Sequence, residues 1–212
     1  VEFERLNPIC NAPVIAIQNT GATPLTQLDI TYGRLGGTMA SYQWTGTLNF
    51  LQTAEVTLPQ PNWLSSNTNE FIVIVTNPNG GTDQYSLNDT LITTFNYPVV
   101  YTSGLVFELK TNTSGSQTSY TLKDSQGNNL INRIGLAANT TYRDTVYLPT
   151  DCYTLKLLDA GDDGLSWWAN PGQGTGYFRI KDAATGTNLR TFNPDFGDNI
   201  YQQFTVNYTL PT

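Results

Sequence analysis

Histidine is absent from the 212 residues of this chain. Its absence excludes Ser-His-Asp and Cys-His catalytic pairs, metal sites built on imidazole, and the general base that enzymes use most often. Two carboxylates could still hydrolyse a glycosidic bond, but no acidic pair stands out and the predicted domains are small for a deep sugar cleft. We therefore predict that the protein is not an enzyme.

Charged residues are also scarce, at 13% of the chain, and the formal net charge is −7. An acidic chain lacks the basic face that neutralises phosphates, so nucleic acid is excluded as a partner, whereas a cation is a suitable one. Low charge together with many Thr, Asn, Ser, Gly, Tyr and Gln residues is typical of extracellular all-β proteins. These features predict a secreted or cell-surface protein.

Long apolar runs are missing as well. The longest, such as FIVIV, are too short to cross a bilayer, and no charged-then-apolar leader is present at residue 1. We expect a monomer without membrane insertion, and a chain that is a mature or excised piece of a larger protein.

No segment keeps apolar residues at helical spacing for three turns. Instead, apolar and polar residues alternate in many short runs, which turn sequences such as NTG, NPNGG and DSQGNN separate. The sequence predicts an all-β chain of two antiparallel β-sandwich domains in tandem, without a helix of three or more turns. Because Pro98 cannot donate to a strand ladder, it marks the boundary between predicted domains at 1–98 and 99–212.

Only two cysteines are present, Cys10 and Cys152. They cannot form a framework of several disulfides, and their spacing is not that of metal ligands. Since they fall in separate predicted domains and a disulfide needs Cα atoms within about 7 Å, we predict that they do not pair. A tightly packed interface between the domains is the alternative.

The stretch DAGDDGLSWWANPGQGTG combines carboxylates, glycines and tryptophans. Three carboxylates within five positions repel one another unless a cation or several N–H donors compensate. Calcium takes about six to eight oxygen ligands, and a short glycine turn supplies carboxylates and backbone carbonyls. We predict a calcium site with these ligands: Asp159, Asp162, Asp163, the carbonyl of Leu165, and Asn112 from a neighbouring loop. A solvated turn whose carboxylates bond local amides is the alternative.

Two consecutive tryptophans, Trp167 and Trp168, follow the acidic turn. On a strand they would point to opposite faces, so at most one is expected to fill the core while the other lies near the surface. A surface ring could stack on a sugar or anchor a protein partner, and packing of both rings against the loop is the alternative. Trp44 and Trp63 are interpreted as core or rim residues of the first domain.

Some polar residues are interpreted as structural. Asp124 and Asp182 each lie between an alternating run and a glycine turn, so we interpret them as caps of hairpin turns and not as catalytic groups. Asn19 and Gly21 predict a tight turn in the first domain. The residues predicted to share the core face around that turn are Val14, Ala16, Leu28, Ile30 and Tyr32.

Several stretches of the first half carry a family resemblance. They are Cys10, APVIAIQNTGATPLTQLDITY, YQWTGTL, AEVTLP and VTNPNGGTDQYSLNDT, and they cover nearly all of residues 8–96. In these stretches the chain resembles immunoglobulin-like domains related to the bacterial cell-adhesion-related domain, which occur in large secreted proteins of the type IX pathway. The resemblance implies an immunoglobulin-like sandwich.

The second half carries a different resemblance, in LVFELKTN, SYTLKDSQGNNL, TYRDTVYLPTDCYTLKLLDAGDDGLSWW and GTGYFRIKDAATGTNL. It is similar to a jelly-roll-like module that follows such domains or closes secreted peptidases. Tyr147 stands where members often have a cysteine, and Asn112 where an acidic residue is common. The resemblance implies a metal-stabilised loop and a binding or accessory module of a larger bacterial protein. A structural spacer that carries a distant catalytic domain is the alternative.

Overall fold

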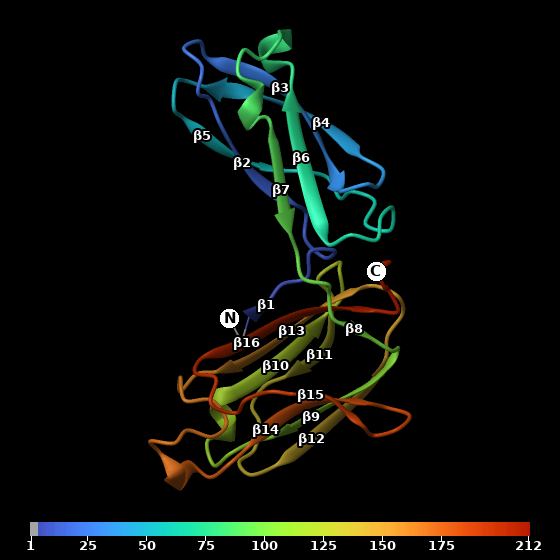
Figure 1. Ribbon diagram of the computed structural model, residues 1–212. Helices are drawn as coiled ribbons and strands as arrows, with labels where there is room; N and C mark the ends of the chain where they lie inside the picture. The colour runs from blue at the N-terminus through green and yellow to red at the C-terminus, as the bar shows by residue number, and fades with distance from the viewer. Residues whose placement is uncertain (1–3) are drawn as a thin grey trace. The chain divides into compact units, whose positions relative to one another are not determined.

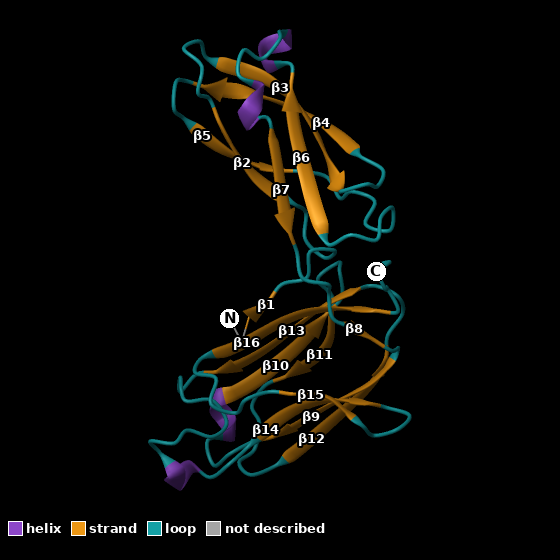
Figure 2. Ribbon diagram, viewed as in Figure 1, coloured by secondary structure: helices purple, strands orange, loops and turns teal. Residues whose placement is uncertain are grey.

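The structure is a computed structural model that describes residues 4–212, and its regular elements are almost entirely strands (Figures 1 and 2). The helical elements in this range are four 3-10 turns of three residues: η1 (Pro78–Gly80), η2 (Ser86–Asn88), η3 (Gly115–Gln117) and η4 (Pro171–Gln173). None of these helices is long and apolar enough to span a membrane. The prediction of an all-β chain without a helix of three or more turns is confirmed.

The chain folds into two compact units. One, here the discontinuous unit, consists of the N-terminal segment up to Cys10 together with Pro98–Tyr208. The other, here the inserted unit, consists of Asn11–Tyr97 and Thr209–Thr212. The chain therefore begins in the discontinuous unit, leaves it after Cys10 and returns to it at Pro98.

Two sheets form the discontinuous unit (Figure 1). The six-stranded sheet has the order β1-β16-β13-β10-β11, with β8 also paired to β16, and the four-stranded sheet has the order β12-β9-β14-β15. The first contains β1 (Glu4–Arg5), β8 (Val100–Tyr101), β10 (Thr118–Lys123), β11 (Asn129–Arg133), β13 (Cys152–Asp159) and β16 (Asn199–Val206). The second contains β9 (Gly104–Lys110), β12 (Thr141–Tyr147), β14 (Tyr177–Asp182) and β15 (Asn188–Thr191). All pairings are antiparallel except those of β1 and β8 with β16.

Alternation along the strands gives the discontinuous unit one core between its two sheets. On β13, Tyr153, Leu155 and Leu157 are buried, and the residues between them face outward. The same core contains Leu105, Phe107, Leu109, Tyr120, Leu122, Phe178, Ile180, Ile200 and Phe204. Burial of each such side chain stabilises the fold by about 1.5–3 kcal/mol. This gain in free energy determines which face each strand turns toward the core. The polar residues between them are thereby fixed on the outer surface.

The inserted unit contains a two-stranded and a four-stranded sheet. The first pairs β2 (Val14–Gln18) with β5 (Thr53–Thr57). The second has the order β4-β3-β6-β7, with β3 (Leu25–Arg34), β4 (Ala40–Leu48), β6 (Glu70–Thr76) and β7 (Thr90–Thr94). Trp44 and Trp63 are buried here, which confirms their interpretation as core residues.

The predicted core face of the inserted unit is right on β3 and wrong on β2. Leu28, Ile30 and Tyr32 are buried as expected. Val14 and Ala16, however, are exposed, while Ile15 is half-buried and Ile17 buried. The stretch APVIAI is apolar at almost every position, so a period of two selects neither face, and a shift of one residue reverses every side chain.

The turn after β2 forms as predicted. The backbone N–H of Gly21 donates to Asn19 Oδ1 at 2.9 Å, and Asn19 Nδ2 donates to the carbonyls of Thr23 and Leu48, both at 2.8 Å. The side chain of Asn19 therefore bonds the turn itself, at Gly21 and Thr23, and also the end of β4, at Leu48. The local bonds are those that an asparagine commonly makes to backbone groups close to it in sequence.

Cys10 and Cys152 form a disulfide with their Cα atoms 5.5 Å apart, so the prediction that they do not pair is wrong. The prediction placed Cys10 in a domain of residues 1–98, whereas the segment that carries it lies in the discontinuous unit. Strand β1 pairs with β16, and the backbone N–H of Asn7 donates to Gln203 Oε1 at 3.0 Å. These contacts bring Cys10 to the start of β13, and no local pattern in the sequence indicates them.

Candidate functional site

The acidic loop, residues 160–176, projects from one end of the discontinuous unit (Figure 1, orange, around η4). Leu165 is fully buried in the core, its N–H donates to the carbonyl of Pro194 at 2.7 Å, and its own carbonyl accepts the N–H of Gly176 at 2.7 Å. These contacts fix the base of the loop and divide it into an acidic turn before Leu165 and a tip after it.

Asp159, the last residue of β13, closes the acidic turn. Its side chain is only 3% exposed, and Oδ2 accepts the backbone N–H groups of Asp163 at 3.1 Å and Gly164 at 3.0 Å. Gly164 has a φ of 69°, and a Cβ there would lie 2.4 Å from the carbonyl oxygen of Pro194. Only glycine fits this position, so the sequence fixes the turn that brings Asp163 back toward Asp159.

The carboxyl groups of Asp159 and Asp163 lie close together in a buried environment. Burial raises the pKa of Asp159, the neighbouring carboxyl of Asp163 raises it further, and the two backbone N–H donors act in the opposite direction. Asp163 is 9% exposed, and its Oδ1 accepts no hydrogen bond from the described residues. Neighbouring buried carboxylates repel each other, and a shared proton or a cation between them relieves that repulsion.

Two further buried oxygens near this pair have no hydrogen-bond partner within residues 4–212. Thr118 lies directly opposite Asp159 in the ladder between β10 and β13, and its Oγ1 is unpaired. Gln117 Oε1 is also unpaired, and a Cβ on Gly161 would lie 2.8 Å from it, so the amide packs on the acidic turn. Carboxylate, amide and hydroxyl oxygens are ligands that suit calcium.

The structure brings Asp159 and Asp163 together, and a third predicted ligand, Asn112, reaches the same turn, where its Nδ2 donates to the carbonyl of Gly164 at 3.5 Å. Asp162 is exposed in a left-handed conformation with φ 59°. The carbonyl of Leu165 accepts the N–H of Gly176, and Asn112 Oδ1 accepts the N–H of Ser114 at 2.8 Å. Across the part of the chain that the structure describes, no group of three or more Asp, Glu, His or Cys residues could hold a metal ion.

Gln117 and Thr118 were not identified from the sequence. Neither is charged, Gln117 precedes an ordinary alternating run, and Thr118 is the first residue of that run. The feature that identifies these two residues is the register of β10 against β13, which places Thr118 opposite Asp159. That register is a long-range property, so the residues that complete the carboxyl pair are found only in the folded chain.

Trp167 and Trp168 lie in the tip of the loop. They are 39% and 82% exposed, and their ring centroids are 6.4 Å apart at an interplanar angle of 67°. At most one ring was expected in the core, and neither lies there, because the tryptophans are not on a strand and Leu165 takes the core position; Trp168 lies at the surface. Gln173 holds the tip, since its carbonyl accepts the N–H of Thr113 at 2.9 Å.

Asp124 and Asp182 cap hairpin turns, as predicted. Asp124 Oδ1 accepts the N–H groups of Gln126 and Asn128, and the side chain of Asn128 contributes most to lowering the pKa of Asp124. Asp182 Oδ1 accepts the N–H groups of Ala184 and Thr185, and the backbone of Thr185 contributes most to lowering its pKa. These bonds occur within a few residues, so sequence reasoning identified them.

A comparison of this chain with known protein families, curated proteins and solved structures finds no match. The functional proposal therefore depends on the chemistry of the acidic loop and its tip.

Proposed function

We propose that the chain is a non-catalytic binding module of a larger secreted or cell-surface bacterial protein, with a loop that calcium stabilises and that contacts a carbohydrate or protein ligand. The observation that carries this proposal is Trp168, which is 82% exposed on a loop whose base contains a buried carboxyl pair. A large exposed aromatic ring supplies contact area for a ligand with few side-chain torsions to fix. The immunoglobulin-like, jelly-roll-like and type IX assignments belong to the same proposal and depend on the sequence resemblance.

Calcium fits the oxygens at the base of the loop. Asp159 and Asp163 would supply two negative charges, and Thr118 Oγ1 and Gln117 Oε1 two neutral oxygens that lack partners among the described residues. Water would provide the remaining ligands, because calcium takes about six to eight oxygens. The ion would neutralise the carboxyl pair and link β10 to the loop that carries the tryptophans.

Calcium is expected to stabilise the discontinuous unit, by about 2.7 kcal/mol at a hundredfold excess over the dissociation constant. The effect should grow as pH rises. Asp159 has a pKa raised above its ordinary value of 3.8, so without calcium its contribution to stability is fully present below that value and is lost as pH rises through the raised pKa. Bound calcium takes the place of the proton on the carboxyl pair, so the stabilisation by calcium should increase with pH. Melting temperatures with calcium and with chelator, compared between about pH 4 and pH 7, measure this increase.

Two aspartate variants sharpen the calcium experiment. Asp163→Asn removes a buried carboxylate and should abolish most of the response to calcium. Asp162→Asn makes the same chemical change at an exposed position and should leave the response to calcium intact. Identical melting curves with calcium and with chelator at neutral pH would contradict a calcium site at the carboxyl pair, and calcium would then be abandoned.

The ligand contact is tested by Trp168→Ala. We expect this variant to melt like the wild type and to bind its ligand about tenfold or more weakly, because an exposed aromatic anchor contributes mainly to binding. Ligands from a panel of oligosaccharides and of extracellular matrix proteins are measured by calorimetry. Tyr147→Ala, which removes another highly exposed ring, is the control.

The outcome distinguishes the two functions. Ligands that bind both variants as tightly as the wild type, or a panel without any ligand, would contradict a role for the loop and favour a structural spacer that carries a distant catalytic domain. The exposure of Trp168 beside Trp167 favours the binding module, because two adjacent indole rings at the tip of one loop offer a ligand a continuous aromatic surface.

A further inference from the structure

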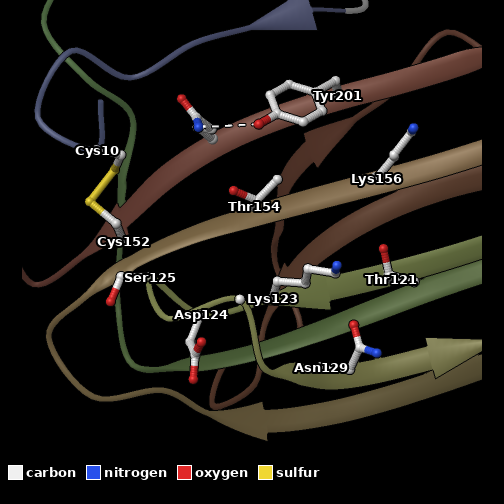
Figure 3. A pocket seen from close by; sticks show the side chains of 12 residues that line it. Cys10, Thr121, Lys123, Asp124, Ser125, Asn129, Cys152, Thr154, Lys156 and Tyr201 are labelled. Atoms are coloured by element: carbon white, nitrogen blue, oxygen red, sulfur yellow. Dashed lines mark hydrogen bonds between the residues drawn. A yellow bond between two sulfur atoms is a disulfide. The ribbon is translucent and has the colours of Figure 1, made fainter. Parts of the chain in front are cut away.

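The outer face of the six-stranded sheet contains a hollow of about 560 Å³, lined entirely by residues of the discontinuous unit (Figure 3). The Cys10–Cys152 disulfide lies beside the hairpin turn at Asp124 and Ser125 at one end of this view. Side chains from four strands form the floor: Thr121 and Lys123 of β10, Asn129 of β11, Thr154 and Lys156 of β13, and Tyr201 and Gln203 of β16.

Strand register arranges these side chains in two rows across the sheet. One row contains Asn129, Lys123, Thr154 and Gln203, and the next contains Thr121, Lys156 and Tyr201. Lys123 and Lys156 are diagonal neighbours on adjacent strands, a relation that places such residues about 7–8 Å apart. Tyr201 lies directly opposite Lys156, so a ring stands beside one of the two cations.

The hollow concentrates positive charge in a chain that is negative overall. It contains two of the four lysines of the sequence, both exposed, and neither forms a salt bridge with a described residue. The one acidic residue of the lining, Asp124, uses both carboxylate oxygens within its own hairpin turn. Two lysines against the single carboxylate of Asp124 leave a net positive charge in the lining, which favours an anionic ligand.

Neutral groups around the lysines suit a sugar. The lining supplies the hydroxyls of Thr121 and Thr154 and the amide of Asn129, which can both donate and accept hydrogen bonds. The ring of Tyr201 is half-buried, and its hydroxyl accepts a hydrogen bond from Gln203 Nε2 at 3.2 Å, which helps to hold its position. An open polar surface with a fixed ring and two cations matches a ligand that has hydroxyls and carboxylates together.

We infer that this hollow binds a polysaccharide of acidic sugars, whose carboxylates pair with Lys123 and Lys156 and whose hydroxyls bond the two threonines between them and Asn129 beside Lys123. The site is separate from the acidic loop. Cys152 and Asp159 are at opposite ends of β13, roughly 23 Å apart, so the hollow is expected to bind whether or not the loop holds calcium.

The opposite sheet is the competing basic surface of the same unit. There, Arg143 and Lys181 both pair with the buried Glu108, at 2.5 Å and 2.9 Å. These contacts neutralise part of the charge, but Lys110 and Arg179 form no salt bridge with a described residue. A test of the hollow must therefore compare the two faces by equal changes of charge.

Polygalacturonate is the probe, with a neutral galactan and polyglutamate as controls, and binding is measured by affinity electrophoresis and calorimetry on the whole chain. Lys123→Gln combined with Lys156→Gln is expected to weaken binding to polygalacturonate by at least about tenfold. Lys110→Gln combined with Arg179→Gln removes the same charge from the opposite sheet and should leave affinity unchanged. Melting curves of both double variants report whether the fold is intact.

Each result supports or overturns the inference. Preference for polygalacturonate over both controls, lost only in the Lys123 and Lys156 variant, supports it. Equal loss in both double variants, or loss only in the opposite-sheet variant, overturns the location. Equal binding of polyglutamate overturns the assignment to sugars, and the absence of binding by the wild type overturns the site. Trp168→Ala should bind the probe normally, which separates this test from that of the loop.

Discussion

Loss of the Cys10–Cys152 disulfide is expected to lower the free energy of unfolding of the discontinuous unit by about 2–5 kcal/mol. The bond joins residues separated by 142 positions in sequence, and chain entropy alone predicts a value near 5 kcal/mol for such a loop. The bond also retains the N-terminal segment at the edge of the six-stranded sheet. Strand β1 pairs with β16 at two residues, and Asn7 adds one buried hydrogen bond to Gln203.

Urea unfolding with and without a reductant measures this loss, with Cys10→Ser combined with Cys152→Ser as the matched variant. The reduced wild type and the double variant should unfold at the same lower urea concentration, and the reductant should not affect the variant. Thiol labelling provides an independent measurement: the unfolded wild type should show no free thiol until a reductant is added. A midpoint that neither treatment changes would mean that the bond constrains a segment already held by its strand contacts.

The disulfide also bears on location. Disulfides persist in oxidising compartments and are rare in the cytosol, so this pair supports the proposal of a secreted or cell-surface protein. The sequence-based argument for the same location used composition and a family resemblance. The bond adds a chemical reason that the sequence did not provide, because the pairing of two distant cysteines depends on the return of the chain at Pro98.

Sequence reasoning succeeded where a few neighbouring residues decide the structure. The turns at Asn19, Asp124 and Asp182 form as predicted because each side chain bonds backbone groups within a few positions. The inward face of β3 was predicted correctly because apolar and polar residues alternate there. On β2, where apolar residues stand at consecutive positions, only packing against the rest of the unit selects Ile15 and Ile17.

The candidate loop shows the same division. Density of charge in a glycine turn identified Asp159 and Asp163, which do meet. The sequence could not exclude Asp162, because adjacent aspartates look equivalent until the backbone conformation is known. It also could not supply the unpaired oxygens of Gln117 and Thr118, which reach the turn through strand pairing. Long-range register therefore determines which oxygens surround the carboxyl pair.

Replacement of Arg34 by methionine is expected to lower the stability of the inserted unit by about 3 kcal/mol. Arg34 is fully buried at the end of β3 and forms no salt bridge with a described residue. Its charge is compensated by carbonyl oxygens: Nε donates to Thr68 at 2.8 Å, and Nη1 donates to Trp63 at 2.7 Å. Nη2 donates to Pro211 at 3.0 Å and so fixes the C-terminal residues of this unit.

Methionine preserves most of the side-chain volume but provides no donor, so three buried or half-buried carbonyls lose their partner at a cost of about 1 kcal/mol each. Arg34→Lys should cause a smaller loss, because an ammonium has donors but cannot reproduce the fork of the guanidinium. Urea unfolding followed by the fluorescence of the buried Trp44 and Trp63, with Trp167 and Trp168 replaced by phenylalanine in every variant, reports on this unit, and Lys110→Met in the other unit is the control. An unfolding midpoint in Arg34→Met equal to that of the control would show that water replaces the guanidinium without loss, and the carbonyl cluster would then not be a determinant of the stability of this unit.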